Sequence, residues 1–295
     1  MKFHLFLPQM RLSLDRLVAS ARAAEAAGFE GMAGMDHLVP PQAKTHPMYE
    51  AMITNTWIAA HTERLTISSL VLCDSFRHPA VLAREAVSLD HASGGRYELG
   101  IGWGSWRGDF STFGIEPAEP RARVQRLRET LEILRALWAG ESVDFDGEFH
   151  HLRGATQVPL PLTRIPILIG GAGPKTLKLV REFADWWNVH VGILDKLEDA
   201  RSEVGDVHVS IQQMVAYVPN EANRSLVTET ALRRFGPSNP VIGTGPELVE
   251  HYASLEERGI ERVYVWFCDF APPETLAAFG NEVIAPLAAL GSPRT

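Results

Sequence analysis

Short apolar runs alternate with segments of helical periodicity along the whole 295-residue chain. The first pair is the apolar run KFHLFLPQ followed by SLDRLVASARAAEAAG, in which apolar residues recur every three or four positions. We expect Ser13 to cap the start of this helix and Gly28 to end it. Repeated strand–helix pairs imply a parallel sheet with right-handed crossovers, whose faces are covered by helices.

The alternation predicts eight strands, each followed by a helical segment. Eight such pairs favour a closed (β/α)8 TIM barrel over an open doubly wound sheet, so we expect one α/β domain over residues 1–295. Residues 141–164 interrupt the rhythm after the fourth helix. Because VDFDGEFHHLRG predicts a hairpin around Asp146 and Gly147, we interpret this segment as an insertion and not as a domain boundary.

Charge and composition narrow the class of ligand. The formal net charge of −8 argues against nucleic acid and against an anionic membrane surface as partners. The two cysteines, Cys73 and Cys268, are too few for a disulfide framework. No apolar run reaches the roughly 18 residues that span a bilayer. We therefore expect a cytoplasmic protein that binds a small molecule.

The segment ILIGGAGPKTLKLV places four small residues between a predicted strand and a predicted helix, namely Gly170, Gly171, Ala172 and Gly173. Backbone N–H groups at such a corner can bind a phosphate, but the same residues can also simply form a tight turn. A Rossmann motif would need glycine in place of Thr176, and a P-loop would need glycine in place of Pro174. Lys175 and Lys178 either reach a ligand or are solvated.

Asp36 and His37 follow the second predicted strand, at the carboxyl edge where barrel active sites are built. A histidine in that position can act as a general acid or base near neutral pH. The alternative is a histidine that only caps a loop.

The segment GIGWGSWRGDF ends the fourth predicted strand with alternating glycines. Glycines inside a strand indicate that a flat ligand or a neighbouring chain segment comes close to the backbone. Trp103 and Trp106 could stack on a ring system or could only pack, and Ser105 and Asp109 are the polar groups nearby.

Other kinds of site are less favoured by the sequence. Cys73 ends the third predicted strand, and we interpret it as a buried thiol without a catalytic role. The adjacent His150 and His151 would point to opposite faces of a strand, and no HExxH motif is present, so no metal site is expected.

Five segments in the same order resemble the bacterial luciferase-like monooxygenase family, and within it the branch that uses the deazaflavin coenzyme F420. The segments are GFEGMAGMDHLVP, RLTISSLVLCDSFRHPAVLAREAVSLDHASGGRYELGIGWG, RLRETLEILRALWAGESVDFDGEFH, PILIGGAGPKTLKLVREFADWWNV and GTGPELVEHYASLEERGIERVYVWFCDF. Together they extend over nearly the whole chain.

The resemblance implies a flavin-type cofactor at the carboxyl ends of the barrel strands. It also implies a cis peptide bond between Leu70 and Val71 in a bulge behind the ring, and phosphate contacts at the glycine corner. The cofactor contacts expected on this basis are Asp36, Ser69, Leu70, Val71, Trp103, Gly104, Ser105, Gly170, Gly171, Ala172, Gly173 and His190.

The pair Asp36–His37 is similar to a DH pair in deazaflavin-dependent sugar-phosphate dehydrogenases of this family. Those enzymes have a glutamate where this chain has Ser105, and a tryptophan in the region where this chain has Gln42 and Lys44. These departures argue against a sugar-phosphate substrate and leave Asp109 as the nearby carboxylate that could substitute for the glutamate.

The sequence therefore predicts an F420-dependent oxidoreductase that transfers a hydride between F420 and a small organic substrate. We expect His37 to handle the proton, oriented by Asp36 or its backbone, with Asp109 as a further catalytic candidate. An FMN-dependent monooxygenase and a non-catalytic F420-binding protein are the alternatives. The family resemblance also predicts a homodimer.

Overall fold

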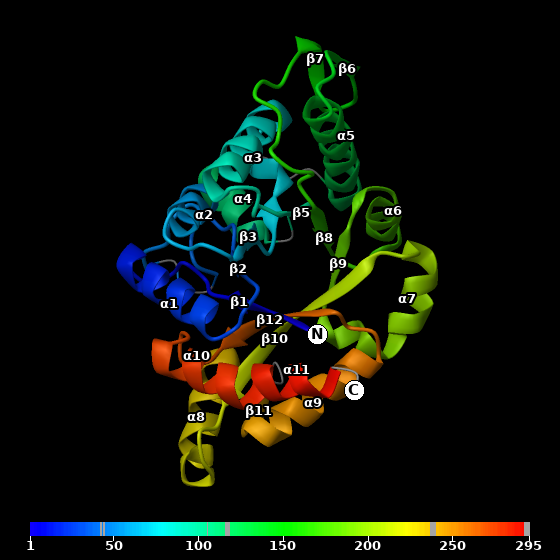
Figure 1. The fold of residues 1–295 in the computed structure, drawn as a ribbon. Helices are drawn as coiled ribbons and strands as arrows, with labels where there is room; N and C mark the ends of the chain where they lie inside the picture. Colours follow the sequence, from blue (N-terminus) through cyan, green and yellow to red (C-terminus); the bar gives the residue numbers. More distant parts are fainter. Residues whose placement is uncertain (42, 44, 105, 116–118, 237–239, 292–295) are drawn as a thin grey trace.

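A parallel sheet wraps around the centre of the molecule, and helices surround it (Figure 1). The computed structural model describes residues 1–41, 43, 45–104, 106–115, 119–236 and 240–291. The order of neighbouring strands in this sheet is β3-β2-β1-β12-β10-β9-β8-β5-β4. These strands are β1 (Lys2–Phe6), β2 (Gly31–Gly34), β3 (Thr66–Ser69), β4 (Leu72–Cys73), β5 (Leu99–Gly102), β8 (Ile167–Gly170), β9 (Trp186–Val189), β10 (His208–Tyr217) and β12 (Arg262–Phe267).

The two ends of this strand order meet, which closes the barrel. Strands β3 and β4 are consecutive pieces of the chain, separated only by Leu70 and Val71. Strand β4 pairs with β5, and Ile67 of β3 forms a parallel bridge with Tyr97, just before β5. With β3 and β4 taken as one position, the strands occupy the eight positions of a (β/α)8 barrel, as the alternation predicts.

The helices of the described residues surround the barrel (Figure 1). They are α1 (Leu14–Ala26), α2 (Ala51–Ala59), α3 (Pro79–Ser93), α4 (Arg107–Phe113), α5 (Pro120–Trp138), α6 (Pro174–Phe183), α7 (Leu197–Val204), α8 (Arg224–Phe235), α9 (Gly245–Glu257), α10 (Pro273–Phe279) and α11 (Ala285–Gly291). Most of them cover the outside of the barrel, and α4 lies at the carboxyl ends of the strands. Ser13 caps α1 as expected, because its hydroxyl accepts the Arg16 N–H at 3.2 Å. Within the described residues, no helix is long and apolar enough to pass through a membrane.

One part of the barrel is more elaborate than the sequence predicts. The polar stretch after β10 contains helix α8 and a short strand, β11 (Val241–Gly243), which pairs with the end of β10. The described part of α8 buries only Ala231 and Phe235, so it lacks the apolar stripe by which the other helices are detected.

The insertion forms a hairpin outside the barrel, beyond one end of α5 (Figure 1). Strands β6 (Val143–Asp146) and β7 (His151–Ala155) pair in antiparallel fashion, which confirms the predicted hairpin. The buried carboxylate of Glu129 in α5 accepts the backbone N–H groups of Glu148, Phe149 and His150 at 2.9–3.1 Å. These bonds attach the turn of the hairpin to the helix.

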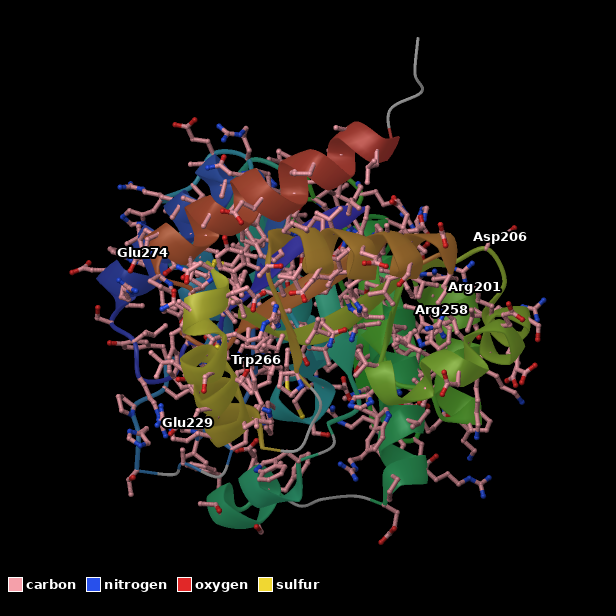
Figure 2. The ribbon with its side chains drawn as sticks, turned by 90° about the horizontal axis from the view of Figure 1, so that it is seen from below. Arg201, Asp206, Glu229, Arg258, Trp266 and Glu274 are labelled. Carbon is pink, nitrogen blue, oxygen red and sulfur yellow. The ribbon has the colours of Figure 1, made fainter. Side chains whose placement is uncertain are left out.

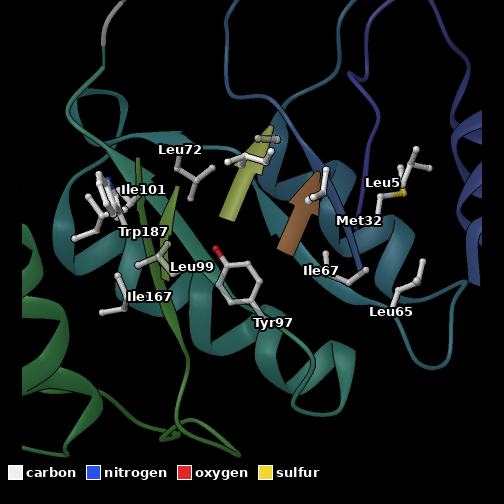
Figure 3. Close-up of a cluster of buried hydrophobic side chains, with 14 of the residues drawn as sticks. Leu5, Met32, Leu65, Ile67, Leu72, Tyr97, Leu99, Ile101, Ile167 and Trp187 are labelled. Atoms are coloured by element: carbon white, nitrogen blue, oxygen red, sulfur yellow. The ribbon is translucent and has the colours of Figure 1, made fainter. Parts of the chain in front are cut away.

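The core lies between the barrel strands and the helices, as the close-up of its apolar side chains shows (Figure 3). Tyr97 and Trp187 are among its largest fully buried side chains. The indole N–H of Trp187 donates a hydrogen bond to the carbonyl oxygen of Gly171 at 2.7 Å. The core therefore fixes the backbone of the glycine corner directly.

A second set of buried side chains fills the barrel interior. Alternate residues of a strand face opposite sides of the sheet, so Phe6 and Tyr264 point inward from β1 and β12 and join a cluster with residues of β8 and β9. The interior also holds a buried ion pair, since Arg262 donates to Glu98 at 2.7 Å and its guanidinium lies 3.6 Å from the ring centroid of Trp186.

The outer face seen from below shows how neighbouring helices are joined (Figure 2). Arg258, at the end of α9, donates to the carbonyl oxygen of Leu194 at 2.7 Å, and Arg201 of α7 donates to the carbonyl oxygen of Gly259. Trp266, in contrast, lies on the same side of β12 as Tyr264, and it packs against Phe6 of the interior cluster and against Phe235 of α8, with ring centroids 5.2 and 5.1 Å apart. Side-chain contacts of this kind hold the helical layer on the strands.

The strand β5 can approach β3 because residue 100 is a glycine. A Cβ atom on Gly100 would overlap the carbonyl oxygen of Ser69, and it would lie 3.1 Å from the hydroxyl oxygen of Ser68. The first of these neighbours is backbone and cannot rotate away.

We expect Gly100→Ala to destabilise the fold by about 1–3 kcal/mol or more, because the added methyl group must displace a barrel strand. Gly170→Ala is the matched control, since its Cβ would lie at an ordinary 3.5 Å from Val71. Urea denaturation of both variants measures the difference. Equal stability of Gly100→Ala and the unchanged protein would contradict this account.

Candidate functional site

A cavity of about 280 Å³ opens at the carboxyl ends of β2, β4, β5 and β8, and we refer to it as the His37 cavity. This is the edge at which parallel barrels build their active sites. Nine of the predicted site residues lie in its wall: Asp36, His37, Leu70, Val71, Trp103, Gly104, Asp109, Gly170 and Gly171.

The back of the cavity is the short bulge between β3 and β4. The peptide bond between Leu70 and Val71 is cis, as the resemblance implies. The Val71 side chain faces the backbone of two neighbouring strands, because a Cβ on Gly102 would lie 2.9 Å from it and a Cβ on Gly170 would lie 3.5 Å from it. Of the two expectations for the strand glycines, a flat ligand or a neighbouring chain segment, Gly102 therefore meets the second, because the Val71 side chain lies against it.

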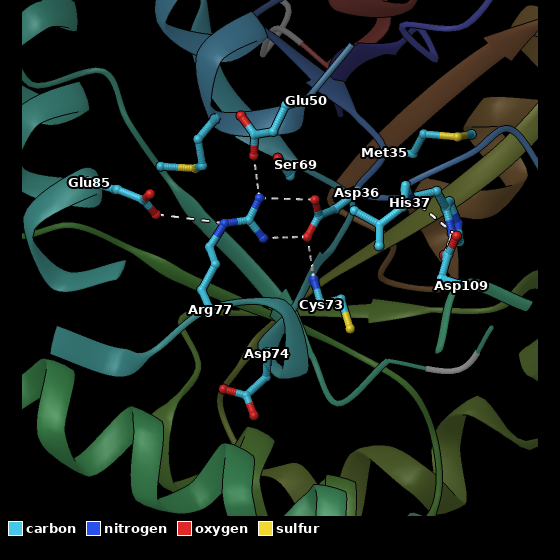
Figure 4. Close-up of polar contacts among 12 residues, drawn as sticks. Met35, Asp36, His37, Glu50, Ser69, Cys73, Asp74, Arg77, Glu85 and Asp109 are labelled. Carbon is cyan, nitrogen blue, oxygen red and sulfur yellow. Dashed lines mark hydrogen bonds and ion pairs between the residues drawn. The ribbon is translucent and has the colours of Figure 1, made fainter. Parts of the chain in front are cut away.

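His37 and Asp109 form a hydrogen-bonded pair at the cavity (Figure 4). The Nδ1 atom of His37 lies 2.8 Å from Oδ2 of Asp109, and the other carboxylate oxygen accepts the Leu38 N–H at 3.3 Å. The Asp109 side chain is only 1% exposed, whereas that of His37 is 26% exposed. Because an ionised carboxylate can only accept, Nδ1 carries the hydrogen and Nε2 is left for a ligand.

Asp36 has a different set of partners. Its carboxylate accepts two hydrogen bonds from the Arg77 guanidinium, at 2.6 and 3.0 Å, and one from the backbone N–H of Cys73 at 2.8 Å (Figure 4). The prediction that the Asp36 side chain orients His37 is therefore wrong, because Asp109 is the hydrogen-bond partner of the His37 ring. Asp36 instead ties the end of β2 to the segment that follows the bulge.

Arg77 lies at the centre of a group of carboxylates. It also pairs with Glu50, and its Nε atom lies 3.6 Å from Glu85. Burial alone would lower the pKa of Arg77, but the hydrogen bonds and charges of Asp36 and Glu50 raise it. Burial raises the pKa of Glu85. Arg77 therefore stays charged, and its guanidinium holds the Asp36 carboxylate in place.

Trp103 is packed from one side by a cation. The Arg123 guanidinium lies 4.7 Å from the Trp103 ring centroid and donates to the carbonyl oxygen of Gly104. Gly104 has φ of +76°, and a Cβ there would lie 2.5 Å from the Cys73 sulfur. The contacts of Arg123 with the Trp103 ring and the Gly104 carbonyl orient the turn that follows β5.

The glycine corner borders two cavities. Gly170 and Gly171 line the His37 cavity, while Gly171 and Ala172 line a second one of about 590 Å³, here the His190 cavity. His190 lies in the wall of this second cavity, where its ring accepts the Gly192 N–H at 3.0 Å. Gly173 caps the exposed start of α6. A phosphate contact at these residues stays a prediction.

Other predicted residues lie elsewhere. Ser69 is 1% exposed, its hydroxyl accepts a hydrogen bond from Asn55 at 2.9 Å, and it is not part of the cavity wall. Ser105, Gln42 and Lys44 lie outside the described residues. Within the described part of the chain, no group of three or more histidine, cysteine, aspartate or glutamate side chains is arranged to hold a metal ion.

Sequence reasoning missed the arginines that organise this site, above all Arg77 and Arg123. Arg123 is 4% exposed and stands next to the apolar stripe of its helix, so its position beside Val124 was a usable signal. Arg77 stands within one of the segments that carry the family resemblance, RLTISSLVLCDSFRHPAVLAREAVSLDHASGGRYELGIGWG, but its partner Asp36 is 41 positions away. Pairing over that distance is set by the barrel and not by any local pattern.

The cysteine beside the bulge is buried. Burial is the main cause that raises the pKa of Cys73 to about 12, and it raises the pKa of Cys268 to about 11. A thiol with such a pKa is a poor nucleophile at neutral pH. This supports the interpretation of Cys73 as a thiol without a catalytic role.

We expect the folded protein to react very slowly with a disulfide reagent such as DTNB at pH 8, because both thiols are buried and protonated. In denaturant, the two cysteines should react at once. Absorbance of the released thiolate measures both rates. Rapid labelling of one thiol in the folded protein would refute the assignment.

Comparison with known proteins identifies the family of the chain. A family model described as Luciferase-like monooxygenase matches residues 1–209. The F420-dependent glucose-6-phosphate dehydrogenase of Microbacterium testaceum (strain StLB037) is 32% identical over 247 residues, which cover 79% of this chain and 71% of that protein. The chain spans about half the length of several other relatives with the same description.

Solved structures share the fold. An F420-dependent secondary alcohol dehydrogenase in complex with an F420-acetone adduct superposes with a TM-score of 0.80 at 19% identity, over 96% of this chain and 98% of that chain. A riboflavin lyase with modified FMN and riboflavin superposes with a TM-score of 0.85 at 13% identity, over 99% of this chain and 92% of that chain. Together with the family match and the relative from Microbacterium, these findings confirm the resemblance seen in the sequence: the chain belongs to the luciferase-like monooxygenase family.

Proposed function

We propose that the chain is an F420-dependent oxidoreductase that transfers a hydride between F420 and a small organic substrate. The observation that carries this proposal is that one cavity is lined by the His37–Asp109 pair, the bulge and the glycine corner. A proton-handling group beside a site for a flat, phosphorylated cofactor is what such a reaction needs.

The residues present fit a deazaflavin. The bulge at Leu70 and Val71 forms one wall of the cavity, and the exposed glycine corner offers backbone N–H groups near the start of α6 for a phosphate. A bound deazaflavin would supply the ring carbon that accepts or donates the hydride.

In this proposal, His37 moves the proton. Its Nδ1–H donates to Asp109, so Nε2 takes a proton from a substrate hydroxyl or returns one to a carbonyl. Asp109 stabilises the positive charge that His37 gains and fixes the ring. Alcohols are the substrate class that best suits this pair, because their oxidation releases one proton from oxygen and one hydride from carbon.

The names of the related proteins support F420 as the cofactor. The relative from Microbacterium testaceum and the secondary alcohol dehydrogenase are both described as F420-dependent. FMN is the alternative, because the same corner suits its phosphate and the riboflavin lyase structure contains a modified FMN. A protein that binds F420 without turnover is the third possibility.

Titration with each cofactor separates these possibilities. We expect F420 to bind saturably, with quenching of its fluorescence, and FMN to bind more weakly because the chain's relatives point to F420. Saturable binding of FMN with no binding of F420 would overturn the proposal.

We expect His37→Ala to lower kcat by about 10²–10⁴-fold, because it removes the proton-transfer group, while the Kd for F420 changes by no more than severalfold. His151→Ala, an exposed histidine of the hairpin, is the control. Loss of oxidised F420 absorbance with a panel of alcohols measures turnover. Undiminished turnover in His37→Ala would remove His37 from the mechanism, and no turnover with any alcohol would favour a binding protein.

A further inference from the structure

A third cavity, of about 570 Å³, lies between α5 and α6, and we refer to it as the Lys178 cavity. Its charged residues are Arg121 and Arg128 from α5, Lys175 and Lys178 from α6, and two acidic residues, Glu119 and Glu148. Four cations and two carboxylates meet here, in a chain whose net charge is −8.

Most of these cations are not neutralised by neighbours. Arg128 pairs with Glu182 at 2.7 Å and with Glu132 at 3.6 Å. Arg121, Lys175 and Lys178 are exposed and form no ion pair with any residue that the structure describes. Cations that face the same cavity without partners create a positive potential that attracts an anionic ligand.

The Lys178 cavity begins where the glycine corner ends. Lys175 is the second residue of α6 and follows the glycine corner and Pro174. Lys178 lies one turn further along the same face of the helix. Helix α5 borders both cavities, since its Arg123 packs on Trp103 of the His37 cavity while Arg121 and Arg128 line the Lys178 cavity. A ligand held at the corner can therefore extend outward along the two lysines.

The opposite side of the corner offers a different surface. The His190 cavity is lined mainly by amide and apolar side chains, among them Asn188, Gln212, Gln213 and Met214. An acidic chain leaving the corner has charge-compensating partners only on the side of the Lys178 cavity, among the cavities described here.

We propose that the Lys178 cavity binds the acidic oligo-glutamyl tail that F420 carries beyond its phosphate. The inference rests on the proposed function, and it deepens it by assigning a site to the part of the cofactor that FMN lacks. Arg121 and Lys178 pair with the tail carboxylates, whereas Lys175 lies nearest the phosphate and contributes to both.

The experiment compares two ligands that differ only beyond the phosphate: F420 with its tail, and the 5′-phosphate of its deazariboflavin, which ends there. The test variant is Arg121→Glu with Lys178→Glu. The control is Arg16→Glu with Arg233→Glu, which makes the same change of net charge on α1 and α8. Fluorescence titration gives the Kd of each ligand at low and high NaCl.

We expect the test variant to raise the Kd of F420 by about tenfold and to leave the Kd of the 5′-phosphate within about twofold. The control should change neither by more than about twofold. In the unchanged protein, F420 should bind more tightly than the 5′-phosphate, and salt should shrink this advantage.

If the Kd of both ligands rises equally in the test variant, or if the unchanged protein binds both ligands with equal affinity, the inference is overturned while the proposed function stays intact. If F420 does not bind the unchanged protein at all, the proposed function fails as well. Thermal unfolding of each variant checks that the exposed substitutions leave the fold in place.

Discussion

The ion pair between Asp36 and Arg77 is the interaction on which the site depends. Asp36 is 7% exposed, and burying a carboxylate costs free energy unless charged or N–H partners surround it. Two guanidinium bonds and the Cys73 N–H provide those partners. Because Cys73 follows the bulge and His37 follows Asp36, one buried charge fixes both the bulge and the strand end that carries the imidazole.

The fold could be predicted from the sequence because its signals are local. Apolar runs and helical periods recur along the chain, and parallel topology then brings the strand ends to one edge of the barrel. The exception is α8, for which local signals are weak: the described helix buries Ala231 and Phe235 and little else. The split of the third strand into β3 and β4 follows from the bulge, which the family resemblance implied at Leu70 and Val71.

The pairing of side chains was less predictable than their positions. The sequence indicated Asp36, His37 and Asp109 as site residues, and all three lie in one cavity wall. Adjacency along the chain suggested that Asp36 orients His37, yet neighbouring side chains diverge, and the partner comes from α4, 72 positions away. Contacts between residues so far apart in the sequence depend on how the loops pack over the carboxyl ends of the strands, and no periodic pattern in the sequence predicts that packing.

The glycine corner separates surfaces of different polarity, and this separation gives the proposed cofactor a direction. The His37 cavity holds a partly exposed histidine paired with a buried aspartate, while the Lys178 cavity holds cations open to solvent. Both lie within residues 1–209, the range that the family model matches. Gln212, Gln213 and Met214 of the His190 cavity lie beyond that range. These surfaces match the parts of F420 in order. The ring would lie in the His37 cavity, the phosphate at the glycine corner and the acidic groups in the Lys178 cavity, so that each part meets groups of complementary polarity.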